Sequence, residues 1–100
     1  MAEPTTPIDD ASARLLMTML ESAARNVQSW LAERHRGSSS DGEVTAEVGP
    51  TGVLLELTID EQARRRLDAR TLGDRVVAAV RAAEAAERMA YAQRFPGRSR

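Results

Sequence analysis

The 100-residue sequence contains no cysteine and no lysine, and it has a single histidine. The absence of cysteine excludes disulfides, thiolate chemistry and the commonest zinc frameworks. No segment approaches the ~18 consecutive apolar residues that indicate a membrane-spanning helix, and the first ten residues lack the basic and apolar regions of a secretory signal. Aromatic residues make up only 3%, so the core must be built from Leu, Val and Ala. We expect a cytoplasmic protein without a membrane segment.

No group of residues has the pattern of an enzyme active site. His35 lies between two arginines without a carboxylate partner, which predicts an exposed residue at a helix end rather than a base or metal ligand. The serines of 38–40 have no companion base and indicate a linker, while Gly49 and Gly52 are typical of a turn and not of a phosphate-binding loop. We expect no catalysis, cofactor, metal or small-molecule substrate.

The two halves of the chain differ in charge, although the net charge is only -1. Residues 1–60 hold ten acidic residues and four arginines, whereas residues 61–100 hold five acidic residues and ten arginines. A net charge near zero argues against strong binding to phosphates, the main source of non-specific affinity for nucleic acid. The chain nevertheless has an acidic first half and a basic second half, so its charge is unevenly distributed.

A long helix is predicted to begin at Asp9 or Asp10, whose carboxylates can cap free backbone N–H groups. Its apolar stripe recurs at spacings of three and four: Leu16, Leu20, Ala23, Val27, Trp30 and Leu31. Two ion pairs at i,i+4 spacing are expected on its polar side: Asp10–Arg14 and Glu21–Arg25. We expect this helix to give way to a flexible connection over 34–43, with Gly37 as its C-cap.

A β-hairpin follows, and then a second long helix. Alternation places Val44, Ala46 and Val48 on one side of a strand, 49–52 forms a turn, and the return strand covers 53–59. On the return strand, alternation groups Val53, Leu55, Leu57 and Ile59 on one face. The second helix is predicted over roughly 70–94, capped by Asp68. Its alanine-rich stripe favours close approach of the helix to a neighbour.

These elements predict an α+β fold with one domain over 9–95, a tail at 1–8 and a basic tail at 96–100. Two strands alone form a marginal sheet with open edges. A first helix of ~26 residues would measure ~39 Å, far beyond the ~13 Å radius of gyration of a compact 100-residue domain. We therefore infer a homodimer that joins the hairpins into a larger sheet and packs the long helices together. The expected interface residues are Leu16, Leu20, Val27, Trp30, Leu55, Leu57, Val76 and Ala83.

The segments "GEVTAEVGPTGVLLELTID" (42–60) and "LDARTLGDRVVAAVRAAEAAERM" (67–89), placed after a long helix, identify a family resemblance. In this order they resemble the YbaB/EbfC family of bacterial nucleoid-associated proteins, over roughly residues 12–95. The most specific part is the pair of glycine-flanked strands that ends in Ile59 and Asp60. The resemblance implies an intertwined, tweezer-shaped dimer with helical arms that binds DNA with little sequence preference in the nucleoid.

The arginines support two interpretations. In the segment "QARRRLDART" (62–71), helical spacing would pair Arg65 with Glu61 and Arg64 with Asp68. That leaves Arg66 without a local counter-charge. On the second helix, Arg70, Arg81 and Arg88 fall within about 20° of one another, opposite the apolar stripe.

Asp74 and Glu84 lie close to this line and could pair with Arg70 and Arg88. The helix face is therefore either a solvated surface of salt bridges or a surface that follows DNA phosphates. The candidate DNA-binding residues are Arg65, Arg66, Arg70, Arg81, Arg88 and Arg94. The alternative is a protein-interaction module on the same fold that has lost DNA binding.

Overall fold

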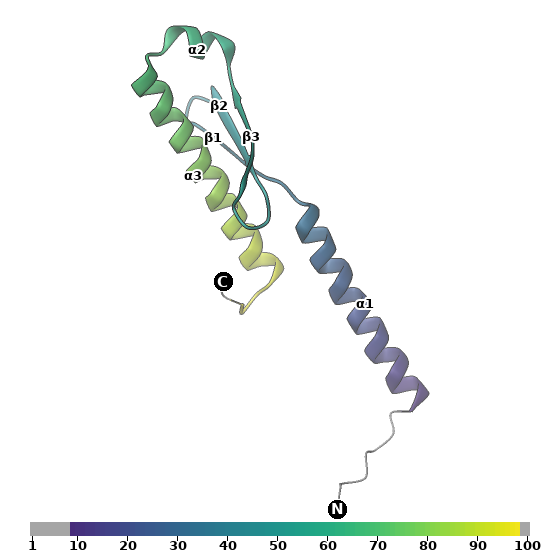
Figure 1. Cartoon of the computed structure of the whole chain (residues 1–100). Helices are drawn as coiled ribbons and strands as arrows, with labels where there is room; N and C mark the ends of the chain where they lie inside the picture. Colours follow the sequence, from purple (N-terminus) through teal and green to yellow (C-terminus); the bar gives the residue numbers. More distant parts are fainter. Residues whose placement is uncertain (1–8, 99–100) are drawn as a thin grey trace, which may run out of the picture. The chain divides into compact units, whose positions relative to one another are not determined.

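The computed structural model describes residues 9–98 and shows an α+β fold (Figure 1). The chain divides into two compact units, Met1–Trp30 and Leu31–Arg100. None of the described helices is both long enough and apolar enough to span a membrane. In chain order the elements are α1 (Asp10–Ala32), β1 (His35–Ser38), β2 (Val44–Val48), β3 (Leu54–Ile59), α2 (Glu61–Arg66) and α3 (Ala69–Arg94).

Helix α1 begins where the sequence predicts. The Asp9 carboxylate accepts a hydrogen bond from the backbone N–H of Ser12 at 2.7 Å, which lowers the pKa of Asp9. The helix is 23 residues long, and of its described residues Trp30 alone is buried. The ion pairs predicted within this helix, Asp10–Arg14 and Glu21–Arg25, do not form among residues 9–98. This prediction is wrong.

The prediction of a flexible connection over 34–43 is wrong, because His35–Ser38 forms strand β1. This strand pairs antiparallel with β2, with His35 opposite Val48. His35 is only 8% exposed and does not lie on the surface. Gly37 is not a helix cap. It lies in β1 at a point where a Cβ atom would overlap backbone atoms of Ala82 and Ala83.

The three strands form one antiparallel sheet in the order β1-β2-β3, and α3 packs against β1 and β2. Val44, Ala46 and Val48 are fully buried on the predicted side and pack against Ala79 and Ala83 of α3. Four partly buried residues complete this core: Ile59, Leu72, Val76 and Val80. Val76 and Ala83, predicted at the dimer interface, therefore belong to the core of a single chain.

The alternation predicted for the return strand is broken by a register shift. Glu47 lies opposite Glu56, but Val48 lies opposite Leu54, so Leu55 is an extra residue on β3. Leu54 therefore takes the place across from Val48, while Leu57 lies opposite Ala46. Within the described chain β3 is an edge strand, and both Leu55 and Leu57 are exposed.

The turn between β2 and β3 and the cap of α3 follow the predicted chemistry. The backbone N–H of Gly52 donates to Gly49 at 3.0 Å, with Pro50 at the second position of the turn. The Asp68 carboxylate caps α3 by accepting from the backbone N–H of Thr71 at 2.7 Å, which confirms the predicted N-cap. Figure 1 shows that the short helix α2 connects β3 to α3.

Two glycine substitutions are expected to have opposite effects on stability. Gly37→Ala should lower the free energy of unfolding by about 1–3 kcal/mol, because the added methyl group meets the backbone of α3. Gly73 lies within α3, and a methyl group added there meets open space. Gly73→Ala should therefore raise the free energy of unfolding by about 0.5–1 kcal/mol. Urea unfolding followed by circular dichroism measures both. Equal effects of the two substitutions would contradict the close packing of α3 on β1.

Candidate nucleic-acid interface

The exposed face of α3 carries a line of three arginines: Arg70, Arg81 and Arg88. They lie on the side of the helix opposite the buried Ala79 and Ala83. At 1.5 Å per residue the line is about 27 Å long. The alanine side of α3 therefore packs against the sheet, and the arginine side faces solvent.

Among residues 9–98, none of these three arginines forms an ion pair. The local pairs that the sequence allowed, Arg70 with Asp74 and Arg88 with Glu84, are not formed within the described chain. Asp74 remains exposed and Glu84 half-buried near the line. The predicted basic line is thus present on α3, and none of its three arginines is held in an ion pair within residues 9–98.

The arginines of α2 differ from the pattern inferred from local spacing. Arg65 pairs with Glu61 at 2.8 Å, as predicted. The Arg64–Asp68 pair is absent from the described residues, and the Asp68 carboxylate instead caps α3. Arg66, predicted to lack a local counter-charge, pairs with Glu43 at 2.5 Å.

Strand pairing explains the unexpected partner of Arg66. Val44 lies opposite Ile59, and the backbone N–H of Asp60 donates to the carbonyl of Glu43 at 2.8 Å. Glu43 therefore lies beside the start of α2, although it is 23 residues from Arg66. Spacing along the sequence gives no signal for such a contact.

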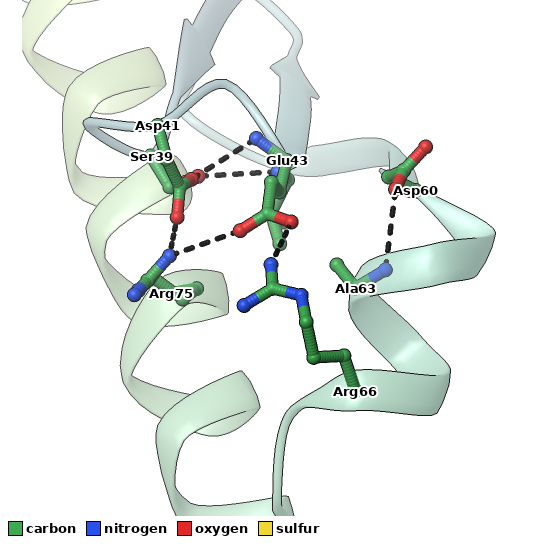
Figure 2. Close-up of polar contacts among 8 residues, drawn as sticks. Ser39, Asp41, Glu43, Asp60, Ala63, Arg66 and Arg75 are labelled. Atoms are coloured by element: carbon green, nitrogen blue, oxygen red, sulfur yellow. Dashed lines mark hydrogen bonds and ion pairs between the residues drawn. The ribbon is translucent and has the colours of Figure 1, made fainter.

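Figure 2 shows that Glu43 belongs to a larger polar cluster. Arg75 of α3 pairs with Asp41 and also reaches Glu43 at 3.3 Å. Ser39, predicted as linker, is buried, and its hydroxyl donates to Asp41 at 2.7 Å. The cluster joins the β1–β2 turn to α2 and α3. Arg75 was missed at the sequence level because both acidic partners are more than thirty residues away.

Other acidic residues of the first half also have arginine partners. Glu47 pairs with Arg36 at 2.6 Å and with Arg34 at 2.8 Å, on the face of the sheet away from α3. The hydrogen bond from Arg36 is the main cause that lowers the pKa of Glu47. Glu33 pairs with Arg94, one of the predicted DNA-binding residues. Glu33, Asp41, Glu43 and Glu47 of the first half are thus each paired with an arginine.

The part of the chain that the structure describes contains no pocket and no group of His, Asp and Glu suited to a metal ion.

A family model described as the YbaB/EbfC DNA-binding family matches residues 13–95. The chain belongs to the YbaB/EbfC DNA-binding family. No curated protein matches it in sequence.

Among solved structures, this YbaB/EbfC family member is similar to the uncharacterized protein HP0035 from Helicobacter pylori. The TM-score is 0.60 at 18% sequence identity, and the match covers 87% of this chain and 92% of the other. At this identity the similarity supports the fold alone. Together with the family match, it agrees with the α+β architecture and with the resemblance found in the sequence.

Acidification should destabilise this family member partly through Asp68, whose pKa is lowered from 3.8 by the hydrogen bond from Thr71. The unfolded state then binds more protons, so the stabilisation is present above about pH 4 and is lost as the pH falls through the folded pKa. Asparagine caps helices about as well as aspartate. Asp68→Asn should therefore keep most of the stability at pH 7 and show a smaller drop in Tm at pH 3. An identical drop in both proteins would contradict this role.

Proposed function

We propose that the chain is a homodimeric, nucleoid-associated DNA-binding protein that contacts phosphates through Arg70, Arg81 and Arg88 with little sequence preference. The observation that carries this proposal is the contrast between arginines. Those three are exposed and form no ion pair within the described residues, whereas Arg66 and Arg75 are engaged by carboxylates. Membership of a DNA-binding family supports the same function.

The geometry of the line suits a phosphate backbone. A length of about 27 Å corresponds to roughly eight base steps at 3.4 Å per strand. Guanidinium groups form charge-assisted, often bidentate, hydrogen bonds with phosphate oxygens. Contacts of this kind position a protein on DNA but carry no direct sequence information. Weak dependence on base sequence is therefore expected.

Arg65, Arg66 and Arg94 remain candidate DNA contacts of lower rank. Each is paired with a glutamate, so a phosphate would have to compete with a carboxylate already in place. Arg65 and Arg66 are still exposed, at 74% and 61% of their side-chain surface. A phosphate could therefore reach these two guanidiniums without unfolding any element.

Homodimer formation would complete the sheet and double the number of basic lines. An open edge strand presents unpaired N–H and C=O groups that readily pair with another chain. Strand β3 is such an edge, and its Leu55 and Leu57 are exposed. Two copies of the arginine line on one dimer would raise the affinity for DNA through avidity.

The second candidate is a protein-interaction module on the same fold. It is favoured by the number of exposed apolar side chains on α1 and β3, among them Leu15, Met19 and Leu54. Exposed apolar side chains that gather on one element, as on α1 taken by itself, mark interaction sites in soluble proteins. Co-purification of a stoichiometric protein partner, together with absent DNA binding, would select this function over the first.

Removing two arginines of the line should weaken DNA binding selectively. For Arg81→Ala with Arg88→Ala, we expect the Kd for a random duplex at low salt to rise at least about tenfold, because two phosphate contacts per chain are lost. Electrophoretic mobility shift measures the effect. The control is Arg34→Ala with Arg36→Ala, which removes the same charge from residues paired with Glu47 and should change Kd by less than about threefold. Equal weakening by both pairs would refute a specific role for the line.

A charge at the open sheet edge should weaken self-association. Leu55→Lys is expected to raise the dissociation constant of the dimer at least about tenfold, because lysine on an edge strand opposes pairing with a second edge. Sedimentation equilibrium measures this constant. The control is Met89→Lys, since Met89 is an apolar residue of α3 with 65% exposure and lies outside the expected interface. Unchanged association of the Leu55 variant would rule out the sheet edge.

A further inference from the structure

We infer that Arg64 of α2 is a further DNA contact, which extends the arginine line of α3 onto the short helix before it. The inference rests on the proposed DNA binding and adds a residue to the same surface. Helix α2 directly precedes α3, and only Leu67 and Asp68 lie between them. The ligand of Arg64 is a phosphate of the duplex backbone, as it is for the line.

The eight arginines of residues 61–94 divide into two groups of four. Ion pairs hold the first group, which consists of Arg65, Arg66, Arg75 and Arg94. Among residues 9–98 the second group forms no ion pair, and it consists of Arg64, Arg70, Arg81 and Arg88. Arg64 is exposed, like the three arginines of the line. It therefore shares the two properties that single out the line for phosphate contacts.

The acidic residues next to α2 have other partners. Helical spacing would pair Arg64 with Asp68, but the Asp68 carboxylate accepts a hydrogen bond from the first turn of α3 at 2.7 Å. Asp60 accepts one from the first turn of α2 at 3.2 Å. Glu61 pairs with Arg65 at 2.8 Å. Within the described chain, none of these three carboxylates pairs with Arg64.

Two contacts fix the rotation of α2 about its axis. Ala63 is fully buried, and Arg66 pairs with Glu43 at 2.5 Å. Figure 2 shows Ala63 and Arg66 on the side of α2 that faces Glu43. At 3.6 residues per turn, Arg64 lies about 160° from Arg66 around the helix. The contacts that anchor α2 therefore hold Arg64 on its outer side.

Arg64 lies near the first arginine of the line. Arg70 follows Arg64 by six residues, so their Cα atoms are at most about 20 Å apart even for a fully extended chain. Along α3, the axial distance from Arg70 to Arg81 is about 16 Å. Figure 1 shows α2 at the end of the sheet where α3 begins. Arg64 therefore continues the series of arginines beyond the start of α3.

Consecutive arginines of α2 supply a matched test in the full-length chain. Arg64→Ala is expected to raise the Kd for a random duplex at low salt at least about fivefold, because one phosphate contact per chain is lost. Arg65→Ala removes the same charge from the next residue, which is 74% exposed and paired with Glu61, and should change Kd by less than about twofold. Arg64→Lys keeps the charge and should restore most of the affinity. Fluorescence anisotropy with labelled duplex measures all three.

Equal weakening by Arg64→Ala and Arg65→Ala, or no effect of Arg64→Ala, would overturn the inference. The loss caused by Arg64→Ala should shrink as salt rises, because a phosphate contact releases counterions. A loss independent of salt would count against a phosphate contact. Circular dichroism and sedimentation should show an unchanged Tm and unchanged self-association for Arg64→Ala. A shift in either would attribute the weaker binding to altered structure and contradict a direct contact.

Photo-cross-linking gives a second readout, which locates DNA rather than measuring charge. The chain has no cysteine, so a single introduced cysteine can carry the photoreactive label. At saturating protein, labelled Arg64→Cys should cross-link to a duplex. The control is Arg36→Cys, since Arg36 is 70% exposed but lies on the face of the sheet away from α3. Comparable cross-linking from both positions, or none from position 64, would exclude DNA contact by Arg64.

The arginine line separates failure of this inference from failure of the proposed function. If Arg81→Ala with Arg88→Ala weakens binding and Arg64→Ala does not, the line stands and Arg64 is excluded from the surface. If the unaltered protein does not bind duplex at low salt, the proposed function is refuted, and the role of Arg64 with it.

Discussion

The close approach of α3 to strand β1 is the contact on which the rest of the structure depends. Gly37 allows it, because any larger residue would meet the backbone at Ala82 and Ala83. The contact fixes the rotation of α3 about its axis, since the alanine side must face the sheet. The arginine line is then directed to solvent as a geometric consequence. Core packing and the proposed DNA surface are two sides of one helix.

Ion pairs between distant parts of the chain determine which charges remain available. Glu33, Asp41, Glu43 and Glu47 all have arginine partners, so the acidic first half presents less negative charge than its composition indicates. These contacts also engage several arginines of the basic second half. The net charge of -1 therefore does not show which charges of the chain are exposed and unpaired. The proposed phosphate contacts lie on the exposed face of α3, where Arg70, Arg81 and Arg88 form no ion pair within the described chain.

Much of the fold could be predicted from local signals, namely both long helices, their aspartate caps and the buried side of β2. Strand β1 could not, because its sequence, HRGS, is short, polar and glycine-containing, and its role depends on packing against α3. The register shift beside Leu55 likewise has no local signature. The line from Arg70 to Arg88 followed from helical periodicity. The partner of Arg66 did not, because strand pairing brings Glu43 to it from a distant segment.

The central claim is that the arginine line of α3 holds DNA through its phosphates. The most direct measurement is the affinity of the intact protein for random duplex DNA as a function of salt concentration. Three contacts per chain in a dimer predict a linear fall of log affinity with log salt, with a slope of about -5, and similar values for duplexes of different sequence. A slope near zero, or no binding of micromolar protein at low salt, would contradict the account.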